Sequence, residues 1–137
     1  MAKDLFHNAV RKALENDGWT ITADPFKVKV LGVQYDVDLG AEKLLAAERL
    51  NEKIAVEIKS FVGASFIYEF HEALGQYLNY EIGIEAKEPD RMLILAVPEN
   101  VFVSYFGIEA IRIAVEKFDI KILAFDPNTQ TITRWKK

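Results

Sequence analysis

The chain has 137 residues, half of them hydrophobic and 28% charged, with a formal net charge of −4. This composition predicts one folded domain over residues 1–137, and the sequence has neither the ~18-residue apolar run of a membrane span nor a signal-peptide core. The absence of cysteine excludes disulfides, thiolate catalysis and cysteine-based zinc sites, and it agrees with the cytoplasmic location that we expect.

The first half of the chain predicts one helix followed by strands. Residues 3–19 carry apolar side chains at helical spacing and predict a helix. Residues 20–40 are rich in β-branched and aromatic side chains broken by glycine and proline, so we expect one or two short strands there. Residues 41–61 predict a β-hairpin with its turn at Leu50 and Asn51.

The second half predicts two helices and three strands. A helical pattern covers residues 65–84, and the wholly apolar segment 91–97 is typical of a strand covered on both faces. Residues 107–118 predict a further helix, and residues 120–137 predict a terminal hairpin with its turn at 126–129. The expected order is α-β-β-β-α-β-α-β-β, an α/β fold with a mixed sheet flanked by helices on both faces.

Two charged side chains interrupt the second strand of the hairpin at 41–61, which reads KIAVEIKSF. Glu57 and Lys59 are two residues apart and therefore point to the same face of the sheet. Burying either charge alone costs several kcal/mol, roughly, unless the charge is paired or bound to something. With a turn at Leu50 and Asn51, Glu42 would lie diagonal to Glu57 on that same face.

These carboxylates predict a metal site that hydrolyses phosphodiesters. Carboxylate oxygens suit Mg²⁺ or Mn²⁺, so we expect Glu42 and Glu57 to bind the ion and Lys59 to assist the attacking water or the developing charge. Asp38 is the alternative first ligand, or an outer one. It has the same strand parity but lies about 13 Å further back along the strand, within reach only if Gly40 bulges the chain.

The hairpin resembles the signature of PD-(D/E)xK nucleases, in which an acidic residue on one strand faces (D/E)-x-K on the next. Alanine and glutamate at 41–42 stand where that signature has proline and aspartate. The (D/E)-x-K pattern recurs at 57–59, 85–87 and 119–121, but only 57–59 combines a buried strand with an acidic hairpin partner. The order of elements also resembles the restriction-endonuclease-like core, and this fold is what the resemblance implies.

Polar residues on the helices add to the predicted site. Gln76 and Tyr80 are four residues apart on one helical face and resemble the Q-x-x-x-Y element of RecB-type nucleases, which implies that Gln76 orients the water or the phosphate. We expect His7 and His71 to be ordinary capped or exposed helix residues, with a phosphate contact by His7 as the alternative.

Nearly the whole chain resembles the XisH family, the excision controlling factors of the cyanobacterial fdxN element. The segments that carry this resemblance are KDLFHNAVRKALENDGW, DLGAEKLLAAE, KIAVEIKSF, FHEALGQYLNY and ILAVP. Membership implies a nuclease-like fold, a role in programmed DNA excision beside a site-specific recombinase, and a small partner protein, XisI.

Two functions are therefore open. The chain is either a Mg²⁺-dependent DNA endonuclease, for which a homodimer would suit double-strand cleavage, or a non-catalytic control subunit that docks the recombinase or an XisI-like partner. The net charge of −4 implies that any DNA contact comes from a local patch, a metal ion or a partner protein.

Overall fold

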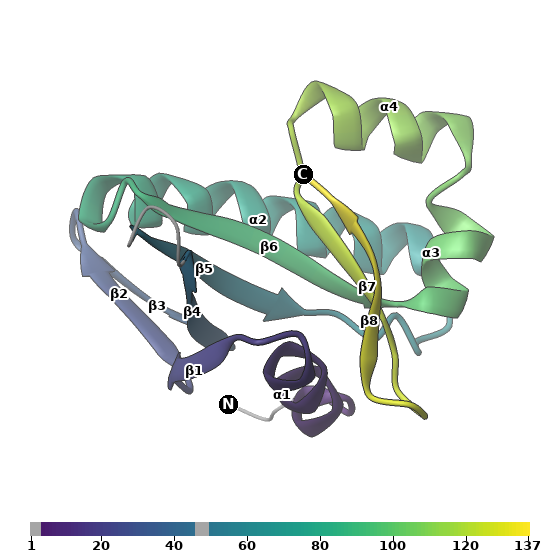
Figure 1. Cartoon of the computed structure of the whole chain (residues 1–137). Coiled ribbons are helices and arrows are strands. Elements are labelled where there is room, and N and C mark those ends of the chain that lie inside the picture. Colours follow the sequence, from purple (N-terminus) through teal and green to yellow (C-terminus); the bar gives the residue numbers. More distant parts are fainter. Residues whose placement is uncertain (1–3, 46–49) are drawn as a thin grey trace.

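Figure 1 shows the computed structural model of the chain, which describes residues 4–45 and 50–137. In chain order the elements are α1 (His7–Asn16), β1 (Thr20–Ala23), β2 (Phe26–Val30), β3 (Val33–Val37), β4 (Leu39–Leu45), β5 (Leu50–Ile58), α2 (Phe66–Lys87), β6 (Arg91–Pro98), α3 (Glu99–Tyr105), α4 (Glu109–Lys117), β7 (Ile122–Asp126) and β8 (Thr131–Lys136). In this described part of the chain, every helix is too short or too polar to cross a membrane.

Six strands form one mixed sheet in the order β1-β4-β5-β6-β7-β8, and β2 and β3 form a separate antiparallel hairpin. The central strands β5, β6 and β7 run parallel, while the outer pairs are antiparallel. Parallel neighbours need long crossovers, and α2 supplies the first of them, with α3 and α4 supplying the second (Figure 1). The predicted α/β class, with a mixed sheet flanked by helices, is confirmed.

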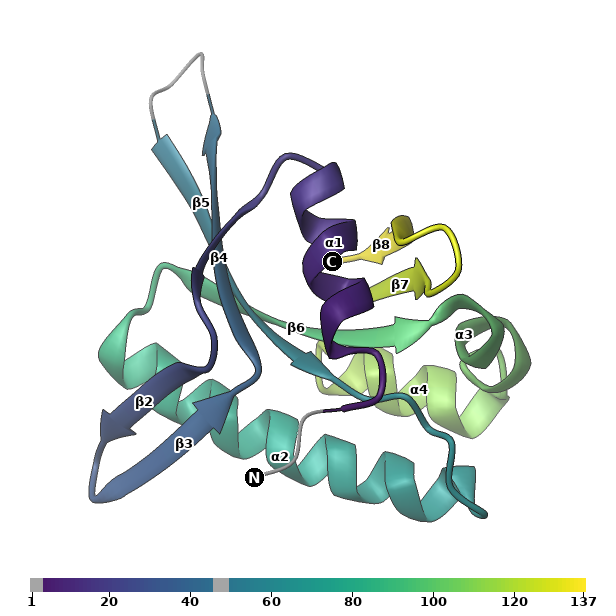
Figure 2. The same ribbon diagram turned by 90° about the horizontal axis from the view of Figure 1, so that it is seen from below.

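The two faces of the sheet are covered by different helices (Figure 2). Ile54, Val56 and Ile58 of β5 pack with the apolar side of α1. The alternate residue Ala55 joins the opposite core, which α2, α3, α4 and the β2–β3 hairpin complete. Alternation along β5 thus decides which helix each side chain meets, and the odd-numbered residues face α2.

The structure differs from the predicted order in three places. Residues 20–40 contain three strands because a separate hairpin, β2–β3, lies against α2. The short helix α3 follows Pro98 directly and was not predicted. The predicted turn at Leu50 and Asn51 is wrong, because both residues belong to β5 and pair with β4, and the connection falls at 46–49, outside the described residues.

A buried tyrosine joins β6 and β7 where the two strands diverge. The Tyr77 hydroxyl donates to the carbonyl of Leu93 at 2.9 Å and accepts from the backbone N–H of Lys121 at 3.0 Å. Tyr77 is 1% exposed. Its phenol therefore satisfies two backbone groups that a strand partner would otherwise satisfy.

Tyr77→Phe should lower the free energy of unfolding by about 1–3 kcal/mol, because it leaves these backbone groups without a partner inside the protein. The matched control is Tyr68→Phe on the same helix, where the side chain is 75% exposed and we expect little change. Urea unfolding curves of both variants measure the difference. Equal midpoints for the two would contradict this role of Tyr77.

Candidate functional site

The pairing of β4 with β5 brings Asp38 beside Glu57. Leu39 lies opposite Val56, so the residue before β4 falls against the residue after Val56. The backbone N–H of Asp38 donates to Glu57 Oε1 at 3.3 Å, and the N–H of Ile58 donates to Asp38 Oδ2 at 2.8 Å. Each carboxylate is thus fixed by the backbone of the other strand.

Lys59 completes a three-residue ionic cluster on this face. Its Nζ lies 3.8 Å from Glu57 Oε2. Glu57 is only 7% exposed, and the Lys59 side chain is about a quarter exposed. In this cluster the carboxylates of Asp38 and Glu57 lie further from solvent, and the ammonium group of Lys59 lies at the solvent boundary.

Glu42 lies elsewhere, and its predicted convergence with Glu57 is wrong. It pairs with Lys53, four residues from Glu57 along β5, which corresponds to roughly 13 Å. Its Oε2 instead lies 4.0 Å from Arg91 Nη2. The cause is the misplaced turn, which displaced the whole register of the hairpin. Asp38, the alternative ligand, is the carboxylate that the structure brings to Glu57.

Burial dominates the electrostatics of the carboxylate pair. Burial, followed by the neighbouring charge of Asp38, raises the pKa of Glu57 from its ordinary value of 4.5 to about 8, against the opposing charge of Lys59. Burial also raises the pKa of Asp38, against the hydrogen bond from Ile58. Two carboxylates in contact, the buried Glu57 and the half-buried Asp38, cannot both ionise cheaply, so the pair retains a proton near neutral pH.

Helix α2 forms one wall of the site. Burial, followed by the charges of Glu57 and Asp38, raises the pKa of Tyr80 to about 12, and the Tyr80 ring packs 5.0 Å from that of Tyr35. Gln76 lies one turn earlier on the helix. Among the described residues its buried Oε1 has no hydrogen-bond partner, so this amide retains bonding capacity.

Helix α1 closes the other side of the sheet with a buried polar chain. His7 is 4% exposed, and its Nε2 lies 2.9 Å from Asp24 Oδ1, while Arg11 Nη1 lies 2.5 Å from Asp24 Oδ2. Asp4 Oδ2 accepts from the N–H of Ser60, at 3.1 Å, which fastens the helix to the residue after Lys59. The helix thus supports the strand end that carries the ionic cluster.

The expectation of an exposed or capped His7 is therefore wrong. Its spacing to Val10 and Leu14 places it on the buried face of α1, and that spacing was the signal available in the sequence. His71 is exposed, as expected.

The carboxylate pair is the part of the site that could supply oxygen ligands to a hard divalent cation. Asp38 Oδ1 and Glu57 Oε2 are the oxygens left over from the backbone hydrogen bonds. In residues 4–45 and 50–137 no group of three or more histidine, aspartate or glutamate side chains could hold a metal ion. An ion here would take two carboxylates and complete its shell with carbonyl oxygen or water, and Mg²⁺ is commonly bound in this way.

The free energy of unfolding of the wild-type protein should fall as the pH rises, and Glu57→Gln should remove this fall. The folded-state pKa lies above the ordinary value, so stability falls as pH rises from about 4.5 through 8, by at most roughly 5 kcal/mol. Denaturant unfolding from pH 5 to 8.5 measures this slope, with Glu109→Gln on the exposed surface of α4 as control. A variant slope equal to that of wild type would contradict the raised pKa.

Comparisons with known proteins agree with this architecture. The family model described as XisH protein matches residues 1–133. The crystal structures of an XisH family protein from Nostoc punctiforme PCC 73102 and of an fdxN element excision controlling factor protein from Anabaena variabilis are each 39% identical, with TM-scores of 0.89. Both alignments cover 98% of this chain and all of the other. No curated protein matches. The chain belongs to the XisH family.

Proposed function

We propose that this protein is a metal-dependent DNA endonuclease of the PD-(D/E)xK type that acts in the programmed excision of a DNA element. The observation that carries the proposal is the interlocked Asp38–Glu57 pair, with Lys59 two residues further along the same strand face. Asp38 takes the first acidic position, which also restores the aspartate of the nuclease signature. A role in excision is supported by the likeness to the Anabaena variabilis protein, which is named as an fdxN element excision controlling factor.

Each side chain of the cluster has a chemical role in this proposal. Asp38 and Glu57 hold a divalent cation, which supplies charge stabilisation at the phosphate and a more acidic water. Lys59 lies at the solvent boundary, where its ammonium group orients the attacking water and stabilises negative charge that develops on the phosphoryl oxygens. Gln76 positions the water through its amide oxygen, which has no hydrogen-bond partner among the described residues.

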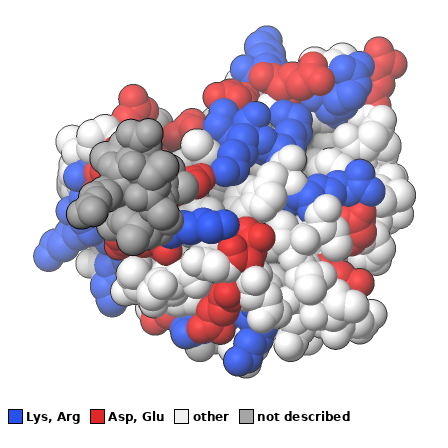
Figure 3. Space-filling model, viewed as in Figure 1, with Lys and Arg blue, Asp and Glu red and all other residues white. Residues whose placement is uncertain are grey.

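Recruitment to DNA requires more than this chain. Its net charge is −4, and Figure 3 shows acidic and basic side chains interspersed over one face. A surface of mixed sign gives little non-specific attraction to phosphates. We therefore propose that an XisI-like protein, a recombinase or a second copy of the chain brings the site to DNA.

The same charge favours a second candidate function. A control subunit that retains the fold and docks a recombinase or an XisI-like partner needs no basic surface of its own. Against it stands the carboxylate pair with the buried Glu57, which a non-catalytic subunit has no physical reason to keep. Cleavage assays separate the two candidates.

Supercoiled and branched DNA should be nicked in Mg²⁺ or Mn²⁺ when the XisI-like partner is present. Asp38→Asn and Lys59→Ala should each slow cleavage roughly 10²–10³-fold, since each removes charge stabilisation at the phosphate. Glu42→Gln should retain activity, because Glu42 lies near Arg91 rather than Glu57. Gel assays of nicking rates test this. If wild type nicks neither substrate, the control-subunit function is preferred, and equal losses for Glu42→Gln and Asp38→Asn would refute the assignment of Asp38.

Binding of Mn²⁺ should strengthen as pH rises from 6.5 to 8.5, because the cation must displace the proton held by the pair, and Glu57 has a pKa raised to about 8. Isothermal titration calorimetry at several pH values measures this affinity without DNA. Glu57→Gln should abolish the binding, whereas Glu42→Gln should not. If the affinity for Mn²⁺ does not depend on pH, or is unchanged in Glu57→Gln, the ion does not bind at the Asp38–Glu57 pair.

A further inference from the structure

A groove of about 730 Å³ opens where the parallel strands β5, β6 and β7 end. The loop after β5 forms one wall, the start of α3 forms the second, and the β7–β8 connection forms the third. A groove of this size accommodates several side chains of another molecule. Its apolar lining consists of Phe6, Phe61, Val62, Pro98 and Val101.

Apolar side chains continue from the groove onto the adjoining helices. Phe66 of α2 stacks on Tyr105 of α3, with 4.2 Å between ring centroids, and its ring lies 5.0 Å from that of Phe61. These contacts hold the loop after β5, the start of α2 and α3 side by side (Figure 2). Around them, six large apolar side chains are between 38% and 75% exposed: Val62, Ile67, Tyr68, Val103, Tyr105 and Ile108. We call these six the α2–α3 patch, and such a grouping on a water-soluble surface marks an interaction site.

The segments that carry the groove and the α2–α3 patch are anionic. Residues 60–80 and 99–111 contain four glutamates and no lysine or arginine. Of the 21 acidic residues in the chain, the other 17 are matched by its 17 lysines and arginines, so these two segments account for the net charge of −4. Glu99 pairs with Arg134, but within residues 4–45 and 50–137 Glu72 and Glu109 take part in no hydrogen bond or ion pair. Asp126 adds a further carboxylate to the groove.

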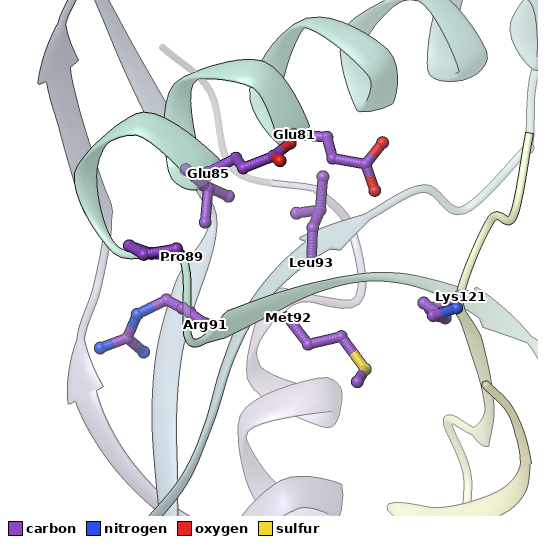
Figure 4. Close-up of a pocket in the computed structure, with 8 residues that line it drawn as sticks. Glu81, Glu85, Pro89, Arg91, Met92, Leu93 and Lys121 are labelled. Carbon is purple, nitrogen blue, oxygen red and sulfur yellow. The ribbon is translucent and has the colours of Figure 1, made fainter.

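The C-terminal half of α2 differs in this respect. Figure 4 shows Glu81 and Glu85 beside a cavity that Lys121 also lines, and the charge of Lys121 opposes that of Glu81. A cation of the chain itself therefore lies near the glutamates at that end of the helix. At the start of α2 the cation has to come from another molecule.

We propose that the groove and the α2–α3 patch bind a basic amphipathic helix of a partner protein. The apolar face of such a helix covers the patch, and its lysines or arginines lie against Glu72 and Glu109, as in other complexes of an amphipathic helix with an apolar groove. A second copy of the chain would bring like charge against like charge, and DNA would bring phosphates against glutamates, so charge complementarity selects a basic protein.

The bound helix also brings positive charge close to the candidate site, because Val62 lies three residues after Lys59. Binding of the helix does not require nuclease activity. The proposal can therefore be tested without DNA, and it stands or fails separately from cleavage.

A fluorescein-labelled peptide of about 14 residues, built from leucine and lysine in an amphipathic helical pattern, serves as the probe. Fluorescence anisotropy with the full chain at pH 7.5 should show saturable binding. The same peptide with glutamate in place of lysine should bind at least 10-fold more weakly. Val62→Ser combined with Val103→Ser should weaken binding of the lysine peptide at least 10-fold, because apolar contact is lost. The matched control, Leu5→Ser with Leu31→Ser, changes two side chains that are 72% and 71% exposed elsewhere, and it should bind as wild type does.

Glu72→Gln combined with Glu109→Gln should weaken binding of the lysine peptide at least threefold, and the difference from wild type should shrink at high salt. All the substituted side chains are exposed, so the fold is kept. The proposal is overturned if the glutamate peptide binds equally well, or if the two double-serine variants lose affinity equally. It is also overturned if sedimentation shows a dimer that Val62→Ser with Val103→Ser dissociates, since a second copy then occupies the patch, or if that variant loses affinity for DNA in the absence of peptide.

Discussion

The alignment of β4 with β5 is the constraint on which the candidate site depends. Both strands alternate side chains between the α1 face and the α2 face, so any even-numbered slip keeps every residue on its proper face. A slip of two residues would nevertheless move Asp38 away from Glu57 by roughly 6–7 Å and break both backbone hydrogen bonds that fix the carboxylates. The apolar pattern thus determines which face of the sheet each side chain occupies. The connection between β4 and β5 determines which charged residues lie opposite one another.

The fold retains a costly feature at this point. The buried Glu57 and the half-buried Asp38 both have raised pKa values, which weakens the folded state at neutral pH, and apolar residues in their place would stabilise it. Backbone N–H groups hold both carboxylates, and Lys59 at the solvent boundary lies beside Glu57. Destabilising groups that the surrounding structure holds firmly in place are typical of functional sites. The proposed cation would therefore explain why the fold keeps these carboxylates.

Sequence reasoning identified the features that local patterns encode. The α/β class, α2, the apolar strand β6 and the shared face of Glu57 and Lys59 all follow from periodicity, and segment likeness identified the XisH family. The register of strands that are distant in the sequence could not be predicted from periodicity. Asn51 suggests a turn, but it lies inside a strand whose pairing with β4 and β6 outweighs that preference, and this error exchanged Asp38 for Glu42. The burial of His7 could have been read from its spacing to Val10 and Leu14, whereas its partner Asp24 meets it only in the folded chain.

The most direct test of the central claim is the anomalous scattering of Mn²⁺ bound to crystals of the protein at pH 8.5. The account predicts one strong peak on the α2 side of the sheet, at about 2 Å from Asp38 Oδ1 and Glu57 Oε2, which is the distance at which carboxylate oxygen binds small divalent cations. A peak beside Glu42 and Arg91, or no peak at the Asp38–Glu57 pair at saturating Mn²⁺, would contradict it.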